Sequence, residues 1–138
     1  LAVLEAVESR RSTRRAGAVG ASLASAWSAA CARASAVPQL VISGATGAAV
    51  STDEEFAALQ ALAPGAVVRA TGSRLGHVLE AHFPVGLALG VMCLNAGLFP
   101  PAAGSSVEKP LAVQPMSVAV TSVGHMRGEG VAVLGAAR

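Results

Sequence analysis

The sequence predicts an α/β fold, in which helices cover a β-sheet. Short apolar stretches typical of strands alternate with longer segments whose apolar residues recur at helical spacing. A chain of 138 residues buries about two-thirds of its unfolded surface, which is enough for a single core. Hydrophobic residues make up 53% of the chain and charged residues only 13%, so we expect one domain over residues 1–138 with an excess of apolar surface that a partner would cover.

The first part of the chain is predicted to hold the end of a strand and one long helix. Leu1–Leu4 has the pattern of a strand end, and Glu5–Arg15 that of a charged helix or turn. Helical spacing then predicts a helix from about Gly20 to Ala36, which Pro38 stops. The residues expected on its buried face are Leu23, Trp27, Ala30, Cys31 and Ala34.

A second strand and a second helix are predicted next. Leu40–Ser43 is a short apolar run of strand type, followed by a turn of small residues, Gly44–Gly47. This turn lacks the lysine and the full glycine spacing of a nucleotide-binding loop. Thr52 and Glu55 have the spacing of a capping box at a helix start, and the buried face of that helix would carry Phe56, Leu59 and Leu62.

The longest apolar segment predicts a central helix. Pro64-Gly65 turns the chain into a strand, Ala66–Ala70, and His77 stands at the mouth of the helix that follows. We expect Gly97 to end this helix and Val85–Leu94 to be buried on nearly all sides.

The same segment does not have the pattern of a membrane span. Phe83–Pro100 contains Pro84 and Asn95 and falls short of a run of roughly 20 apolar residues. The chain begins at Leu1 in the middle of a pattern, with no visible signal or transit peptide. We therefore expect no membrane partner and a fragment of a longer protein.

Two final strands are predicted at Met116–Val123 and Gly130–Gly135, joined by a loop that contains glycine. With the preceding elements they complete the α/β alternation.

The composition gives little support to nucleic-acid, metal or cofactor binding. The formal charge is +2 and aromatic residues make up 3%, which leaves almost nothing to stack on bases. Cys31 and Cys93 are too far apart for a local metal motif and are expected to be reduced core thiols. The alternative is that one of them is a nucleophile paired with a histidine. Neither cysteine, however, has the surroundings of small residues in a tight turn that would present a nucleophile at a strand-to-helix elbow.

Residues Thr71 to His77, with the sequence Thr-Gly-Ser-Arg-Leu-Gly-His, lead directly into the long apolar helix. This stretch resembles the β-ketoacyl synthase family, in which Thr-Lys-Ser-x-x-Gly-His precedes a buried central helix. Pro100-Pro101 and the order of strands and helices also resemble the C-terminal half of that family, over nearly the whole chain. The resemblance implies half of a thiolase-like fold, with a mixed β-sheet flanked and sandwiched by helices.

The resemblance also implies where catalytic residues would stand. In active members a cysteine attacks the acyl thioester, and two histidines stabilise the enolate formed by decarboxylation of the extender unit. The cysteine would lie upstream of this chain. The first histidine belongs to a His-Gly-Thr turn, and we place that position at Ala45. The second matches His77, which is the candidate catalytic residue; the alternative is that His77 is a satisfied hydrogen-bonding group near the core.

Other catalytic positions of the family are replaced. Its lysine corresponds to Gly72, and the glutamate that pairs with this lysine corresponds to Gly86. Losing one partner of a buried ion pair costs roughly 3–5 kcal/mol, so joint loss is what a stable, non-catalytic relative should show. The Gly-Phe-Gly-Gly loop of active synthases corresponds to Gly124–Arg127, with His125 at the gate position. We expect His125 to be an exposed loop residue and His82 to be a helix-surface or interface residue.

The resemblance implies a non-elongating subunit similar to the chain-length factors of type II polyketide or fatty acid synthesis. Such a subunit pairs with an active ketosynthase in a heterodimer, shapes the acyl tunnel, meets an acyl carrier protein and is cytoplasmic. The family is one of acyltransferases, but this subunit is expected to be non-catalytic. The arginines Arg10, Arg11, Arg14 and Arg15 are then either a solvated face or a docking patch for the acidic carrier protein.

Three alternatives stay open at this point. The chain could be the C-terminal half of an active synthase that performs decarboxylative Claisen condensation. It could also be a carrier-protein binding module without catalysis. A decarboxylase or initiation variant would need only part of the histidine pair.

Overall fold

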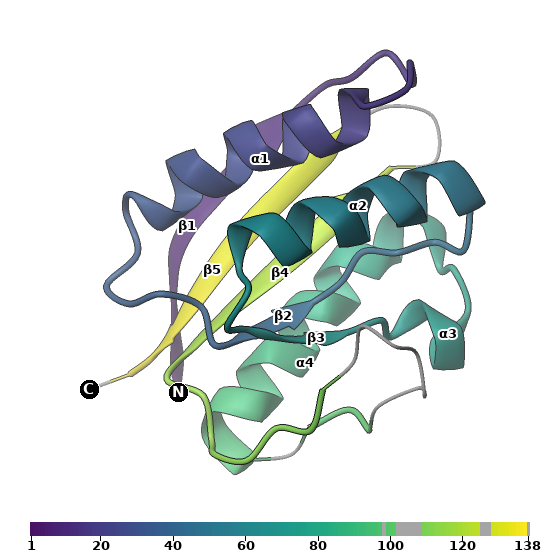
Figure 1. Ribbon diagram of the computed structural model, residues 1–138. Helices are drawn as coiled ribbons and strands as arrows, with labels where there is room; N and C mark the ends of the chain where they lie inside the picture. Colours follow the sequence, from purple (N-terminus) through teal and green to yellow (C-terminus); the bar gives the residue numbers. More distant parts are fainter. Residues whose placement is uncertain (98, 102–108, 125–127, 138) are drawn as a thin grey trace.

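The computed structural model describes residues 1–97, 99–101, 109–124 and 128–137. These residues form three layers, in which one sheet lies between α1 and α2 on one face and α4 on the other (Figure 1). The elements are β1 Ala2–Arg10, α1 Ala18–Cys31, β2 Leu40–Ile42, α2 Ala49–Leu62, β3 Val67–Arg69, α3 Gly72–Leu75, the 3₁₀ helix η1 Leu79–Ala81, α4 His82–Ala96, β4 Ser117–Val123 and β5 Glu129–Ala136.

The sheet is mixed, as expected, with the strand order β1-β5-β4-β2-β3. β2 runs parallel to both of its neighbours, β3 and β4, whereas β5 is antiparallel to β4 and β1. The carboxyl ends of β2, β3 and β4 therefore meet at one edge. Ligands of α/β proteins commonly bind at such an edge.

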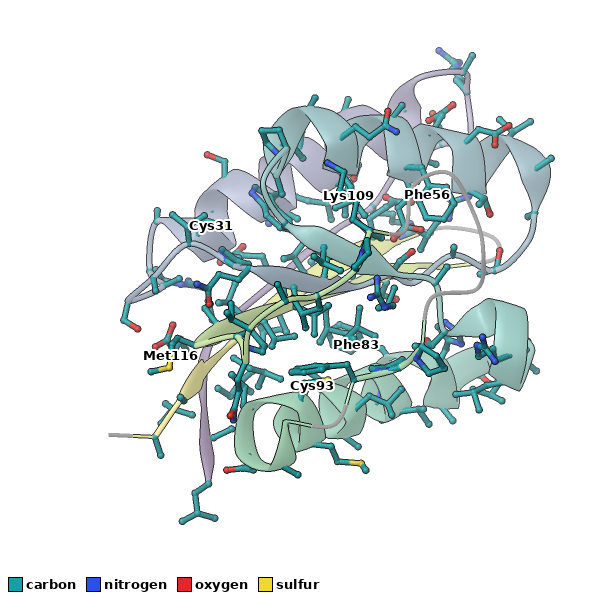
Figure 2. The ribbon with its side chains drawn as sticks, turned by 60° about the horizontal axis from the view of Figure 1, so that its bottom comes forward. Cys31, Phe56, Phe83, Cys93, Lys109 and Met116 are labelled. Atoms are coloured by element: carbon teal, nitrogen blue, oxygen red, sulfur yellow. The ribbon has the colours of Figure 1, made fainter. Side chains whose placement is uncertain are left out.

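Two apolar cores lie on opposite faces of the sheet because successive side chains of a strand point to opposite sides. Val41 faces the core under α1 and α2, where Leu23 and Leu59 are fully buried. Leu40 and Ile42 face α4. Figure 2 shows Phe83 and Cys93 between α4 and the sheet, in this second core.

The first strand is longer than expected, and the prediction of a helix or turn over Glu5–Arg15 is wrong up to Arg10. β1 pairs with β5 from Ala2 to Arg10, with an irregularity between Leu4 and Ala6. An edge strand tolerates charged residues because one of its sides faces water. Only its pairing with β5, which is distant in sequence, identifies the segment as a strand.

The first helix ends at Cys31, earlier than predicted. At Ser35, both the backbone N–H and the hydroxyl donate hydrogen bonds to the Glu5 carboxylate on β1. This contact draws the chain out of the helical path before Pro38.

The capping box is also wrong, because α2 begins at Ala49 and Thr52 lies inside the helix. The carboxylates that follow make tertiary contacts instead. Glu54 accepts hydrogen bonds from the backbone N–H groups of Gly17 (2.7 Å), Val19 (2.9 Å) and Gly20 (3.2 Å). Since α1 has no side-chain cap of its own, Glu54 on α2 satisfies the free amides at the start of α1.

We expect Glu54→Ala to lower the free energy of unfolding by about 1 kcal/mol, the usual cost of a lost helix cap. The N–H donors, that of Gly17 first, hold the pKa of Glu54 below its usual value. The stabilisation is therefore present above the unfolded pKa and is lost as the pH falls through the folded pKa. Urea denaturation at pH 7 and pH 3 tests this, with the exposed neighbour Asp53→Ala as the matched control. Equal losses in the two variants at pH 7 would contradict the capping role.

The long helix begins at His82 and not directly after His77, because α3 and η1 intervene. Pro84 falls in its first turn, where a missing N–H costs nothing. Gly97 ends the helix with a left-handed conformation, as predicted. By length and composition alone, Leu79–Ala96 is long and apolar enough to cross a membrane, but here α4 packs on the sheet.

Within this chain Val85–Leu94 is buried on one face only, so its burial on nearly all sides stays a prediction for the intact assembly. Gly86, Gly90, Cys93 and Leu94 are buried. The residues of the opposite face, Ala88, Val91 and Met92, are exposed. A single sheet covers only one face of the helix, so the apolar composition of α4 exceeds what this chain can bury.

Candidate functional site

The candidate site lies at the shared carboxyl edge of the parallel strands. The turn after β2 comes close to α3, since Ala45 and Gly72 nearly touch, and the start of α4 lies against Gly72. We call the group Ala45, Gly72, His77 and His82 the strand-end site. Its residues come from three separate segments of the sequence.

Two imidazoles meet in the strand-end site. The ring centroids of His77 and His82 lie 5.4 Å apart, with the planes tilted by 50°. His77 is half-buried and His82 is buried, so the expectation of a surface or interface role for His82 is wrong. The helix starts five residues after His77 instead of immediately after it, and His82 consequently points inward from the first turn.

The His82 ring has no hydrogen-bond partner on either nitrogen in the described part of the chain. Burial first, and then the positive charge of a protonated His77, lower the pKa of His82 below its usual value. His82 is therefore neutral at physiological pH. A neutral imidazole offers one donor and one acceptor.

Gly72, where the resemblance places a lysine, leaves no space for a side chain. A Cβ atom there would lie 2.5 Å from the Ala45 carbonyl oxygen and 3.4 Å from Cε1 of His82. The His82 ring and the turn after β2 thus occupy the volume that a side chain at position 72 would need. The backbone would have to move to accept a lysine.

Gly86, the helix position at which the glutamate was expected, likewise has no space for a side chain. A Cβ atom at Gly86 would lie 2.7 Å from Cγ1 of Val120 on β4. Glycine lets α4 approach the sheet closely, and a longer residue would push the helix away. Positions 72 and 86 together therefore have no room for a buried ion pair.

The position of the first histidine also lacks a donor side chain. Aligned on Thr46, a His-Gly-Thr turn has its histidine at Gly44, one residue before the position that we assigned, Ala45. A Cβ atom at Gly44 would lie 2.7 Å from both Cα of Ser122 and the carbonyl oxygen of Thr121. Neither position presents a hydrogen-bonding side chain, so His77 is the sole retained catalytic candidate in the described part of the chain.

A buried carboxyl group lies directly behind the turn, and the sequence analysis missed it. Glu55 is fully buried, and its Oε1 accepts hydrogen bonds from the Ser43 hydroxyl (3.1 Å), the Gly44 N–H (3.0 Å) and the Thr121 hydroxyl. Burial raises the pKa of Glu55 despite these donors. Its position on the inward face of α2, four residues before the buried Leu59, was the signal that could have revealed it.

Neither cysteine is placed to act as a nucleophile. Cys93 is buried in the core under α4, and Cys31 is half-buried on α1. Burial raises the pKa of both thiols, whereas nucleophilic attack needs the thiolate. Among the residues that the structure describes, no group of three or more His, Cys, Asp or Glu could hold a metal ion.

Of the four arginines in the cluster, two form ion pairs within the chain and two are exposed. Arg10 binds its neighbour Glu8 at the surface of β1, and Arg14 binds the buried Glu129 of β5. Arg11 and Arg15 are exposed and remain available to a partner.

His125 and its neighbours at the predicted gate lie outside the described residues.

The described residues of the site can therefore offer an imidazole to a ligand, but they bring no nucleophile to it. His77 can form a hydrogen bond with a carbonyl oxygen. The second donor and the ion pair that would complete the family's constellation have no room in this backbone.

No protein-family model matches the sequence, and no curated protein matches it. Solved structures match over nearly the whole chain. The ishigamide ketosynthase/chain length factor has a TM-score of 0.82 and 17% identity, covering 98% of this chain and 38% of that one. The PfaC keto synthase-chain length factor has a TM-score of 0.75 and 16% identity, covering 99% and 13%.

A third structure, the oxazolomycin ketosynthase domain OzmH KS8 of Streptomyces albus JA3453, has a TM-score of 0.74 and 20% identity. It is matched over 99% of this chain and 45% of its own length. The chain thus spans less than half of each of these structures. The expected thiolase-like fold, with a mixed sheet and helices on both faces, is confirmed.

Proposed function

We propose, from the ketosynthase fold of this chain, that it is the C-terminal part of a non-elongating ketosynthase-like subunit of the chain-length-factor type. The observation that carries the proposal is the lack of space at Gly72 and Gly86. The fold is retained while the ion pair of the active enzymes has no room. Residues 1–138 form the C-terminal-like domain of a longer chain.

The partner that we propose is an active β-ketoacyl synthase of type II polyketide or fatty acid biosynthesis. Support comes from the exposed apolar face of α4, where Val91 and Met92 are 37% and 47% exposed. Two of the similar structures are named as pairs of a ketosynthase and a chain length factor. In the assembled protein this subunit would shape the acyl tunnel without performing the condensation.

We further propose that the subunit meets an acyl carrier protein and that it acts in the cytoplasm. Arg11 and Arg15 project from the β1–α1 connection, where they would attract an acidic carrier protein. The pairing is tested by co-expressing the full-length subunit with an active ketosynthase. We expect a heterodimer on size-exclusion chromatography; a well-folded monomer that ignores the synthase would contradict the proposal.

We expect His77→Ala to change condensation by the heterodimer by less than a few-fold. A non-catalytic subunit stabilises no enolate, so the variant should lose at most about 1–3 kcal/mol of stability from a buried group left without its bond. In an active site, loss of a donor to developing charge would lower kcat by roughly a hundredfold or more. Such a loss in a complex that remains folded and paired would overturn the proposal.

One observation favours a second candidate, the C-terminal half of an active synthase or decarboxylase. His77 is retained and lies beside another imidazole, His82. Release of carbon dioxide from malonyl carrier protein by the subunit alone, abolished by His77→Ala, would favour this candidate. Without that release, the chain-length-factor assignment stands.

A further inference from the structure

The pocket between β3, α3, α4 and Phe99–Pro101 holds a buried positive charge. Arg69 is 4% exposed and lines this pocket. Its Nε donates to the Pro100 carbonyl oxygen and its Nη1 to the Val68 carbonyl oxygen, each at 2.8 Å. Both acceptors are neutral, and Arg69 has no carboxylate partner in the described part of the chain.

An arginine at this position is not explained by packing. The side chain of Arg69 points to the same face of the sheet as Val67, two residues earlier, and that face is the apolar core under α4. An apolar residue would fill the position without loss of hydration. A guanidinium group has five N–H donors, and the two carbonyl groups account for only two of them. A buried charge of this kind is strongly unfavourable unless a counter-charge reaches it.

The rest of the pocket has the walls of a site for an aliphatic chain. Its volume is about 300 Å³, at the lower end of the range for small-molecule sites. Leu89 and Met92 of α4 form one apolar wall and Phe99 another. Arg74 and the buried Thr71 also line the pocket. The lining therefore combines guanidinium groups with a largely apolar surface.

We infer that this pocket binds a medium-length aliphatic monocarboxylate, with the carboxylate on Arg69 and the alkyl chain against Leu89, Met92 and Phe99. A planar guanidinium binds a carboxylate through two parallel hydrogen bonds, and a carboxylate is the smallest common head group of an aliphatic chain that can do so. A neutral head group would leave the charge of Arg69 without a counter-ion. The inference goes beyond the proposed function and does not rest on it. Met92 belongs both to this pocket and to the α4 face proposed for pairing, but Arg69 has no part in the proposed pairing.

The test compares octanoate with 1-octanol, which has the same chain length but no charge, by calorimetric or NMR titration of the protein. We expect octanoate to bind at least tenfold more tightly than 1-octanol. Arg69→Met should remove most of this difference while leaving the weak binding of 1-octanol unchanged. Equal affinities for the two compounds in the unmodified protein would overturn the inference.

A second variant covers the case in which Arg69→Met does not fold. Met92 is half exposed on the pocket wall, so Met92→Trp should fill the pocket without disturbing the core and should weaken octanoate binding at least tenfold. Val91→Trp is the matched control, because Val91 is exposed on the same helix but does not line the pocket. If Met92→Trp binds octanoate as tightly as Val91→Trp does, the site lies elsewhere and the inference fails.

Discussion

Glu55→Ala should lower the free energy of unfolding by about 3–5 kcal/mol, among the largest effects of a single substitution. The change leaves a cavity in a fully buried position and removes the acceptor of the Ser43 and Thr121 hydroxyls. A buried donor without a partner costs about 1–3 kcal/mol. Because Glu55 holds the turn that follows β2, the variant should also disorder the strand-end site.

Glu55→Gln is the matched control and should lose little stability. The hydrogen bonds from Ser43, Gly44 and Thr121 all reach Oε1, and Oε2 has no partner in the described residues. A neutral carboxyl with its proton on Oε2 accepts these bonds through Oε1, and the carbonyl oxygen of glutamine can do the same.

The pH dependence of the stability distinguishes a neutral Glu55 from an ionised one. Because burial raises the folded pKa of Glu55, its contribution to stability is fully present below the unfolded pKa and is lost as the pH rises through the folded pKa. Glutamine cannot ionise, so the stability of Glu55→Gln relative to the unmodified protein should increase from pH 5 to pH 8. Urea denaturation at both values measures the difference. If Glu55→Gln is as unstable as Glu55→Ala at both, the carboxylate is charged and our account is wrong.

Arg14→Met should cost about 3–5 kcal/mol, since it leaves the Glu129 carboxylate buried without its partner. The side chain of Glu129 is 0% exposed and that of Arg14 is 22% exposed. Arg14 also donates to the Gly124 carbonyl oxygen, and the Ser12 hydroxyl donates to Glu129 at 3.0 Å. These contacts join the β1–α1 connection to Gly124, directly after β4, and to Glu129, at the start of β5.

Replacing both partners by methionine should restore most of the lost stability, because no charge is then left buried. The control is Arg10→Met, which breaks a more exposed pair with Glu8, at side-chain exposures of 35% and 17%, and should cost far less stability than Arg14→Met because water screens an exposed pair. Thermal unfolding of the three variants measures these differences. An Arg14→Met variant no less stable than Arg10→Met would show that water reaches Glu129 and that the pair is not a buried one.

The local pattern of the chain was sufficient to predict most of the architecture. β2, β3, β4 and β5 lie at the predicted runs, within a few residues, and Gly97 ends α4 as expected. Periodicity is a local property, and a segment with one buried face shows it whatever the rest of the fold does. The same local pattern revealed His77 through the residues around it.

Tertiary contacts decided the remainder. β1 is a strand because it pairs with β5, and no pattern within Glu5–Arg10 contains that information. Adjacent glutamates took different roles: Glu54 caps α1 and Glu55 supports the turn after β2.

For the candidate site, too, the sequence predicted some features and the tertiary structure decided others. The sequence by itself determined that lysine and glutamate are absent at Gly72 and Gly86. Only the tertiary structure decided that no side chain fits at those positions and that His82 lies beside His77. It also decided that Arg69 is buried without a carboxylate partner among the described residues. The physical reason is that spacing along a chain specifies which face a residue shares with its neighbours, whereas burial, desolvation and close approach depend on elements that are distant in sequence.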